Sequence, residues 1–319
     1  MEIFADTTTL PHRYKESFIT IGNFDGVHRG HQYLFAELLG KAKEDKAPAL
    51  IVTFDPHPKM VLHPEIRPFY LLTTREEKLA LLAHTGLDVV VVIPFDLVYA
   101  QKTADAFVEE ILWKHLQVRK IFIGQDYRFG KNKEGDSKLL HRWGERLGFE
   151  VTVIPPFFLN GDVVSSTRIR KAILRGEVDL ARLLLGRPYN VFGRVIAGKG
   201  RGHSLGFPTA NVEPFKDLLP ARGVYAVFAN VEEKVLRGVM NIGTNPTFDN
   251  CQLSLEVHLL NFSGNLYGKR IDIHFVERIR EERLYPNERE LSSQIREDIK
   301  KAEEILNAYP LVASEILWK

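Results

Sequence analysis

The chain has 319 residues, of which 45% are hydrophobic and 26% are charged, and this length predicts two domains with hydrophobic cores. Its 43 basic and 41 acidic side chains give a formal net charge of +2, so the composition provides no broad positive surface for nucleic acid or a membrane. The single cysteine excludes an intramolecular disulfide and a thiolate metal cluster, and it is typical of a reducing compartment. No apolar run reaches the length of a bilayer span, and we expect a cytoplasmic protein.

Up to about residue 185, short apolar runs alternate with amphipathic segments. The apolar runs predict strands at residues 17–24, 49–54, 88–95, 120–124 and 150–155. Between them, apolar residues recur every three to four positions and predict helices at 32–43, 75–84, 104–116 and 138–147. This alternation indicates an α/β domain, a doubly wound, Rossmann-like parallel sheet with helices on both faces. Such sheets bind ligands at the carboxyl ends of their strands.

The pattern changes after Gly186. Strand-like runs follow with few helical patterns between them, at residues 191–197, 224–231, 235–242, 253–260 and 270–276. They predict a small antiparallel β-barrel. A terminal helix is expected to begin near Asn287, with Glu290 at capping-box spacing, and to end before Pro310. Four residues form its expected apolar face: Leu291, Ile295, Ile299 and Ile305. We therefore expect domains at 1–185 and 186–319.

Residues 22–31, GNFDGVHRGH, follow the first apolar strand directly. Three glycines allow the backbone to turn sharply and to approach a ligand closely: Gly22, Gly26 and Gly30. A helix that begins near Val27 would direct free N–H groups at the same place. On a helical turn His28 and His31 would share a face and could reach one phosphate. Two structural histidines or a metal site are the alternatives, and a metal would need a third ligand.

This segment resembles the GxFDGxHxGH signature of the nucleotidylyltransferase superfamily. Residues 164–170, VSSTRIR, resemble its ISSTxIR motif with valine at the first position, although Ser-Ser-Thr alone is more often a helix N-cap. Residues 53–58, TFDPHP, and 124–130, GQDYRFG, resemble segments of the flavin-adenylylating branch. The resemblance implies catalysis by His28 and His31. It implies nucleotide contacts by Gly22, Phe24, Asp25, Gly26, Gly30, Ser166, Thr167 and Arg170. The expected flavin contacts are Asp55, Pro56, His57, Pro58 and Asp126.

Residues 198–211, GKGRGHSLGFPTAN, form a second candidate site. A flexible loop that contains Gly198, Gly200 and Gly202 could fold over phosphates. The oxygen-bearing side chains of Thr209 and Asn211 suit a hard cation, whereas the plainer alternative is a surface loop followed by a turn. The end of the segment, GFPTAN, resembles the hallmark of riboflavin kinases, in which the threonine and asparagine bind Mg-ATP. His203 stands where many relatives have arginine.

Glu256 falls at the position of the catalytic base of that family. Strand alternation would put Leu255 and Val257 on one face and Glu256 on the other, but an exposed strand glutamate is common. The chemistry favours a functional role, because a ribityl hydroxyl is a poor nucleophile that needs a proton acceptor.

Together, the motif sets occur in the order found in bifunctional bacterial riboflavin kinase/FAD synthetases, from about residue 17 to 305. The resemblance implies phosphorylation of riboflavin to FMN with release of ADP. It also implies adenylylation of FMN to FAD with release of pyrophosphate, with ATP as co-substrate and Mg²⁺ in both reactions. We expect no nucleic-acid or membrane partner, and the sequence makes no prediction of oligomeric state. The alternatives are one active half, an adenylyltransferase for another acceptor such as phosphopantetheine, or a flavin-sensing or nucleic-acid-binding regulator.

Overall fold

The computed structural model describes residues 1–198, 202, 205–232, 234–247 and 250–309. The chain forms two compact units, one of Met1–Phe69 with Thr73–Ser165 and one of Tyr70–Leu72 with Ser166–Lys319. The second unit thus includes two helices that precede residue 186. The expected division of the two functions at residues 185 and 186 stays a prediction.

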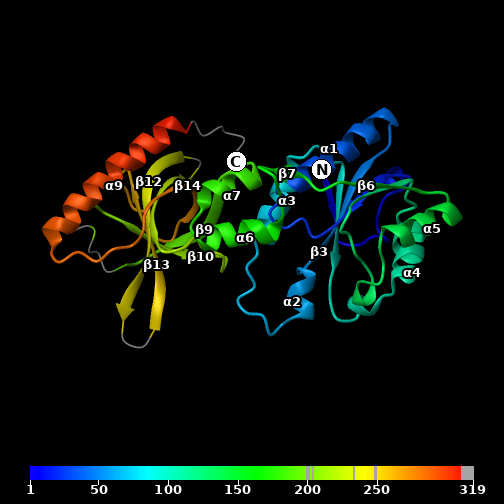
Figure 1. Ribbon diagram of the computed structural model, residues 1–319, viewed down its shortest axis with the longest axis horizontal. Coiled ribbons are helices and arrows are strands. Elements are labelled where there is room, and N and C mark those ends of the chain that lie inside the picture. Colours follow the sequence, from blue (N-terminus) through cyan, green and yellow to red (C-terminus); the bar gives the residue numbers. More distant parts are fainter. Residues whose placement is uncertain (199–201, 203–204, 233, 248–249, 310–319) are drawn as a thin grey trace. The chain divides into compact units, whose positions relative to one another are not determined.

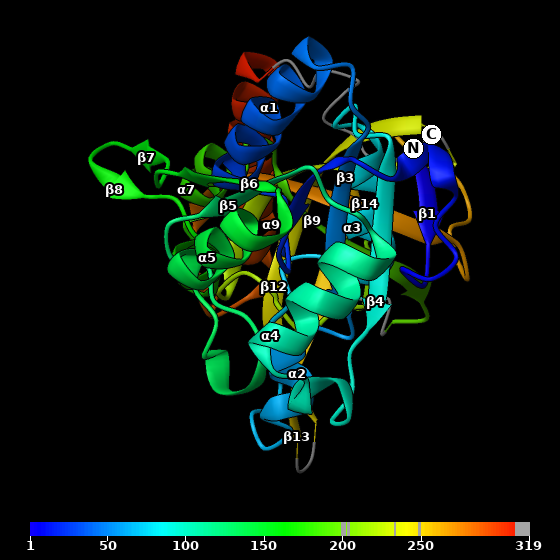
Figure 2. The same ribbon diagram turned by 90° about the vertical axis from the view of Figure 1, so that its right-hand side faces the viewer.

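The first unit is built on a six-stranded parallel sheet. Its strands are β1 (Glu2–Phe4), β2 (Phe18–Ile21), β3 (Ala49–Asp55), β4 (Val89–Pro94), β5 (Lys120–Gly124) and β6 (Glu150–Ile154). Their order is β1-β4-β3-β2-β5-β6, and every neighbouring pair is parallel. Figure 2 shows β1, β4 and β3 on one side of the unit and β5 and β6 on the other. The five predicted strands are confirmed. The short edge strand β1 was not predicted.

Helices cover both faces of this sheet. They are α1 (Arg29–Glu44), α3 (Arg75–Ala83), α4 (Ala104–Ala106), which continues as a π-helix over Phe107–His115, and α5 (Ser137–Leu147). The short α2 (Pro58–Leu62) follows β3 and has no buried residue. The π-helix and α5 pack on the sheet face that carries Ile19, Leu50 and Val91. Right-handed crossovers place α1 and α3 on the opposite face. Helix α1 begins two residues later than expected, because His28 is its N-cap. A hairpin of β7 (Phe158–Leu159) and β8 (Asp162–Val163) ends the unit.

The second unit contains a closed antiparallel barrel of six strands. They are β9 (Tyr189–Ile196), β10 (Ala210–Pro214), β11 (Gly223–Val231), β12 (Lys234–Thr247), β13 (Asn250–Leu259) and β14 (Arg270–Arg280), in the order β10-β13-β12-β11-β14-β9. Two helices precede the barrel, α6 (Ser166–Leu174) and α7 (Val178–Leu185), and α9 (Glu288–Ala308) follows it. Helix α9 packs along β11, β12 and β14 (Figure 1). The barrel and the terminal helix confirm the predicted fold, and β10 is the one strand of the barrel that the sequence pattern missed.

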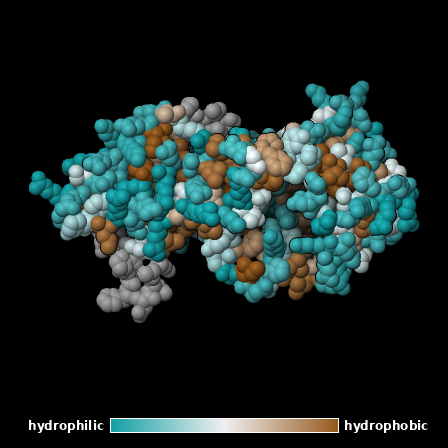
Figure 3. Space-filling view, viewed as in Figure 1, coloured by the Kyte–Doolittle hydropathy of each residue, from teal (hydrophilic) through white to brown (hydrophobic). Residues whose placement is uncertain are grey.

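The face shown in Figure 3 is predominantly hydrophilic. On this face, hydrophobic residues are scattered among hydrophilic ones. None of the helices in the described ranges combines the length and hydropathy needed to cross a membrane.

Candidate active sites

The first candidate site is the loop of residues 22–28, which joins β2 to α1. Strand β2 is central, with β3 on one side and β5 on the other. The chain proceeds from β2 through β3 to β4 in one direction and places β5 and β6 in the other, so β2 and β5 flank the switch in strand order. Doubly wound sheets bind ligands at that point. The loop therefore has the position that the sequence predicted.

His28 is the N-cap of α1 rather than a member of its first turn. Its ring is 5% exposed, and its Nδ1 accepts a hydrogen bond from the backbone N–H of His31 at 3.3 Å. An Nδ1 that accepts from an amide leaves the proton of the neutral ring on Nε2. A Cβ at Gly30 would lie 3.2 Å from the His28 ring, so a larger residue at this position would require the ring to shift. The site thus presents an N–H donor beside the positive end of a helix dipole.

The ring of His31 lies against that of His28, with centroids 3.6 Å apart and an interplanar angle of 18°. The structure therefore brings the two histidines together, although only His31 lies within the helix. Burial, reinforced by the neighbouring His28, holds the pKa of His31 well below its usual value of 6.5. His31 is therefore neutral at neutral pH and serves as a polar, uncharged neighbour of any bound anion.

The rest of the loop is held by the chain itself. Gly26 supplies the turn with a φ of 85°, and the Phe24 ring packs edge-on against Phe35 with centroids 5.0 Å apart. The carboxylate of Asp25 is buried, and it accepts hydrogen bonds from the backbone and hydroxyl of Thr73. Direct nucleotide contact by these loop residues, and by Gly22 before them, stays a prediction.

The residues proposed for flavin flank this loop. Asp55 ends β3 and lies 3.5 Å from the Arg75 guanidinium, and the following Pro56 and Pro58 lead into α2. His57 caps α2, with its Nδ1 accepting from the backbone N–H of Lys59.

Asp126 follows β5, the other neighbour of β2, and is exposed. The structure thus brings the candidate flavin residues to the carboxyl ends of strands on either side of the loop. Their contact with a flavin stays a prediction.

The SSTRIR segment forms the start of α6 in the second unit. Ser166 and Thr167 occupy the first turn, and Arg170 lies one turn further on. The Arg170 Nε donates to the Tyr70 carbonyl at 2.5 Å, so residues 70–72 fix the direction of the guanidinium. A helix start with two hydroxyls has the donors that a phosphate needs.

The second candidate site is a row of side chains across three barrel strands. Asn211 on β10 lies directly opposite Glu256 on β13, and Glu256 lies opposite Asn241 on β12. Leu255 and Val257 are buried in the barrel, so the row lies on the outer face. Opposed residues in antiparallel strands share a face with Cβ atoms about 5 Å apart. The row therefore confirms the alternation that the sequence predicted around Glu256.

Neighbouring side chains orient this row. The Ser254 hydroxyl donates to the Glu256 carboxylate at 2.8 Å. His258 donates from Nδ1 to the Pro208 carbonyl at 2.8 Å, which ties the segment carrying Thr209 to β13. A Cβ at Gly198 would collide with the Asn211 amide, and one at Gly202 would lie 2.9 Å from the Thr209 hydroxyl. Gly200 and His203 lie outside the described residues.

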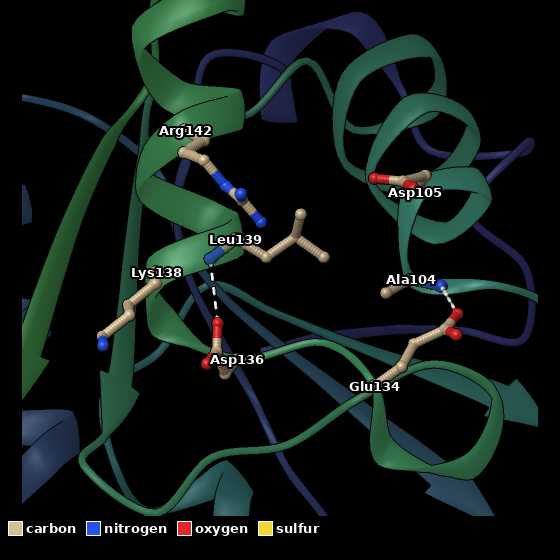
Figure 4. Close-up of a pocket in the computed structure, with 7 residues that line it drawn as sticks. All are labelled: Ala104, Asp105, Glu134, Asp136, Lys138, Leu139 and Arg142. Carbon is tan, nitrogen blue, oxygen red and sulfur yellow. Dashed lines mark hydrogen bonds between the residues drawn. The ribbon is translucent and has the colours of Figure 1, made fainter.

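Two cavities lie elsewhere in the first unit. One, of about 500 Å³, lies between the starts of α4 and α5 (Figure 4). Its carboxylates are engaged within the chain, since Asp105 accepts from Trp143, Glu134 from the Ala104 amide and Asp136 from the Leu139 amide. The other, of about 580 Å³, lies beside Tyr99. Neither cavity is lined by a residue proposed above for catalysis or binding.

Sequence reasoning missed several residues at both sites. Asn241 and Ser254 have no motif of their own, and only the strand register puts them beside Glu256. Thr73 and Lys78 contact the loop of residues 22–28 from a distant part of the chain. The capping-box spacing of Thr74 and Glu77 could have located the helix start between them, but not its contact with the loop.

Two family models match successive parts of the chain. Residues 10–168 match the FAD synthetase family model, and residues 185–306 match the riboflavin kinase model. The bifunctional riboflavin kinase/FMN adenylyltransferase of Escherichia coli K12 is 41% identical over 281 residues, which cover 88% of this chain and 90% of the relative. The protein with the same description from Haemophilus influenzae is 38% identical over 291 residues, 91% of this chain and 94% of the relative.

The chain belongs to the bifunctional riboflavin kinase/FMN adenylyltransferase family.

The fold likeness extends over both units of this family member. A crystal structure described as a macrolide-efflux protein from Streptococcus pneumoniae aligns with a TM-score of 0.85 and 30% identity, covering 94% of this chain and 98% of that one. Within the family, the FAD synthetase match contains the His28 loop, and the riboflavin kinase match contains the Glu256 row. ATP is the co-substrate of both activities in the family name.

Two oxygen donors beside Glu256 fit a hard cation. Thr209 offers a hydroxyl and Asn211 an amide oxygen, and Asn211 is in register with Glu256. Mg²⁺ prefers oxygen ligands and completes its shell with waters and phosphate oxygens. In the described residues no group of three or more His, Cys, Asp and Glu side chains could hold a metal.

Proposed function

We infer that this chain carries out two consecutive reactions of flavin cofactor synthesis. Its C-terminal part transfers the γ-phosphate of ATP to riboflavin and forms FMN and ADP. Its N-terminal part transfers AMP from a second ATP to FMN and forms FAD and pyrophosphate. The main support is that the GNFDGVHRGH segment lies in the part of the chain that matches the FAD synthetase model, and that GFPTAN and Glu256 lie in the part that matches the riboflavin kinase model. The single cysteine supports a cytoplasmic location.

Adenylyl transfer needs charge neutralisation more than a base. The FMN phosphate has a second pKa of about 6, as phosphate monoesters do, and is mostly a nucleophilic dianion at neutral pH. The site must hold two mutually repelling anions in line and stabilise the charge that grows on the α-phosphate. We assign this stabilisation to the Nε2–H of His28, to His31 and to the backbone N–H groups at the start of α1.

The outer phosphates of that ATP need their own donors. Ser166 and Thr167 supply hydroxyls at the start of α6, and Arg170 supplies a planar guanidinium. The Nε of Arg170 is already bonded to Tyr70, which limits the rotation of the guanidinium. We propose that these three residues bind the pyrophosphate that leaves.

Phosphoryl transfer to riboflavin needs a base, because a ribityl hydroxyl is not ionised at neutral pH. Glu256 is the carboxylate on the outer face of β13, and Ser254 bonds one of its oxygens. We propose that Glu256 accepts the hydroxyl proton as the oxygen attacks the γ-phosphate. Asn241 lies next to it in register and can donate an N–H to the ribityl chain.

Mg²⁺ is proposed for both reactions. When bound, it neutralises phosphate charge and positions the group that is transferred. In the C-terminal part, Thr209 and Asn211 would hold it. The His258 bond to Pro208 keeps Thr209 near β13, and Gly198 leaves room for the Asn211 amide.

Product analysis tests this proposal directly. Purified protein is incubated with riboflavin, ATP and Mg²⁺, and FMN and FAD are separated by chromatography; a second incubation starts from FMN and ATP. The proposal expects FMN and then FAD in the first incubation and FAD in the second. FMN alone would indicate an inactive N-terminal part, and FAD from FMN without any riboflavin phosphorylation would indicate an inactive C-terminal part. Omission of Mg²⁺ tests whether each reaction requires the cation, and both products should then be lost.

A further inference from the structure

The loop that carries the N-terminal site has a strained backbone. Phe24 and Val27 have φ angles of 49° and 42°, in the left-handed region that residues with a Cβ rarely adopt. The cost is greater for Val27, which is β-branched and buried. Such strain persists only where the surroundings determine the conformation, and it is concentrated at functional sites. The contacts that hold this loop are therefore of functional interest.

The first contact comes from Thr73, the residue before the N-cap of α3. Its backbone N–H and its hydroxyl donate to Oδ1 of Asp25 at 3.0 and 3.1 Å. The same hydroxyl oxygen accepts the N–H of Gly26 at 3.1 Å. Thr73 and Asp25 are both 4% exposed, so water does not compete for these bonds. One hydroxyl thus fixes two successive residues of the loop.

The second contact comes from Lys78, which is 8% exposed. Its Nζ donates to the Asn23 carbonyl at 3.4 Å, the Thr53 hydroxyl at 3.2 Å and the Phe54 carbonyl at 3.1 Å. Three acceptors satisfy the three N–H groups of an ammonium. The lysine therefore joins the carboxyl end of β2 to that of β3, and its charge lies beneath the loop.

The start of α3 holds both side chains in place. Thr74 and Glu77 form a reciprocal capping box, with bonds of 2.6 and 3.2 Å. Thr73 precedes the N-cap, and Lys78 is the fourth helical residue. In many helices these two positions carry apolar residues that pack together, so they share a side of the helix. Here both are polar, and both contact residues 23–26.

We infer that Thr73 and Lys78 are positioning residues for adenylyl transfer: they hold residues 23–27 in a strained conformation that directs His28 and the start of α1 at the reacting phosphates. The inference rests on the proposed adenylyltransferase activity. It also gives a structural role to the buried Asp25, whose Oδ1 accepts both hydrogen bonds from Thr73. Loss of these contacts should lower turnover more than substrate affinity. The reason is that the N–H donors of the loop act on charge that develops during the reaction.

The test compares Thr73→Val, which removes the hydroxyl at nearly constant volume, with Thr73→Ser, which keeps it. The matched control is Thr85→Val at the other end of α3, where the hydroxyl donates to Leu82 and accepts from Leu87. Each variant is assayed for FAD formation from FMN and ATP, for riboflavin phosphorylation and for Tm. We expect Thr73→Val to lower kcat of FAD formation by about 10- to 100-fold with KM changed less than threefold, because displacement of an active-site group by about 1 Å costs that much. Thr73→Ser and Thr85→Val should retain most of the activity.

A double-mutant cycle of Thr73→Val and Asp25→Asn tests whether Thr73 acts through its hydrogen bonds to Asp25. If Thr73 acts through Asp25, Thr73→Val should reduce kcat little further in the Asp25→Asn background. Lys78→Met, with Lys78→Arg as its charge-conserving partner, provides a second measurement if Thr73→Val does not fold. The inference is overturned if Thr73→Val and Thr85→Val lower FAD formation equally, or if the loss follows Tm alone. Absence of FAD formation by the unchanged protein would instead refute the proposed function.

Discussion

The imidazole rings of His28 and His31 are stacked, with their centroids 3.6 Å apart. Two imidazolium ions at this distance would repel each other strongly, so the two rings are not both charged in the free site. Burial keeps His31 neutral, and the Nδ1 of His28 accepts the His31 N–H. The pair therefore offers the His28 Nε2–H as a donor to a bound phosphate.

The stacked pair predicts a pH dependence of stability. The pKa of His31 is well below 6.5 in the folded protein, whereas an unfolded chain titrates near 6.5. Between these two values the unfolded state binds more protons, so the free energy of unfolding should fall as pH falls below 6.5, by up to about 1.4 kcal/mol per pH unit. His31→Gln should flatten this slope. Urea unfolding at pH 7.5, 6.5 and 5.5 measures it.

Tryptophan fluorescence can report this unfolding from the first unit. Trp113 and Trp143 lie there, and a Trp318→Phe background removes the remaining signal. The control is His141→Gln, because His141 is exposed on α5. An unchanged slope in His31→Gln would contradict the assigned direction of the pKa.

Removal of either imidazole should separate the two activities. His28→Ala or His31→Ala should lower FAD formation from FMN by about 10²- to 10³-fold, because a donor to the developing phosphate charge is lost. Riboflavin phosphorylation should persist, since it uses residues of the other unit. His141→Ala is the control. Parallel loss of both activities would indicate misfolding, and full FAD formation would refute the role of the histidines.

The converse separation is expected at Glu256. Glu256→Gln keeps the shape of the side chain but removes the proton acceptor, so riboflavin phosphorylation should fall by about 10²- to 10⁴-fold. Adenylylation of FMN should remain measurable. Glu277→Gln, on an exposed position of β14, should leave both rates unchanged. Unchanged kinase turnover in Glu256→Gln would exclude it as the base.

Ser254 should affect the kinase reaction by orienting Glu256. The lost hydrogen bond to a half-buried carboxylate predicts a decrease in kcat of about tenfold for Ser254→Ala. The KM for riboflavin should change little, and Ser254→Thr should retain the rate. A rise in KM at constant kcat would instead assign Ser254 to substrate binding.

Much of this architecture follows from sequence periodicity. Strands β2 to β5 are largely buried on both faces and therefore appear as continuous apolar runs, as in Val89–Pro94. Strand β10 carries no such run, because Pro208 precedes it and its outward residues include Asn211 and Glu213. It was missed although it holds a predicted cation ligand. Pairing with β9 and β13, rather than local propensity, makes it a strand.

The site residues were predictable from the sequence only where they belong to a local motif. His28 and His31 follow from a local pattern, and the structure brings them together. The contacts of Thr73 and Lys78 with residues 23–26 span about fifty positions of sequence, so no local pattern reveals them. The late start of α1 has a local cause, since the His28 side chain caps the helix in place of the usual serine, threonine or aspartate.

Helix α9 illustrates the remaining limit and gives the last prediction. Its expected apolar face was confirmed in part, since Ile299 and Ile305 pack against the barrel, but Asp298 is buried on the same side. The Asp298 carboxylate accepts hydrogen bonds from Arg280 Nε at 2.9 Å and Nη2 at 2.7 Å. The buried negative charge on the apolar face of α9 is therefore paired with a guanidinium. Asp298→Ala leaves the Arg280 guanidinium without this partner. It should cost about 3 kcal/mol of stability in the second unit.

Thermal inactivation of the two activities checks this cost. In Asp298→Ala, riboflavin phosphorylation should be lost at a temperature several degrees lower, and FMN adenylylation should also lose thermal stability, because Ser166, Thr167 and Arg170 of α6 belong to the same unit. Glu297→Ala, an exposed neighbour on α9, is the control. Arg280→Met combined with Asp298→Leu should recover part of the loss, because two apolar side chains leave no buried charge unpaired. Equal behaviour of Asp298→Ala and Glu297→Ala would show that the ion pair contributes nothing to the stability of the barrel and its helix.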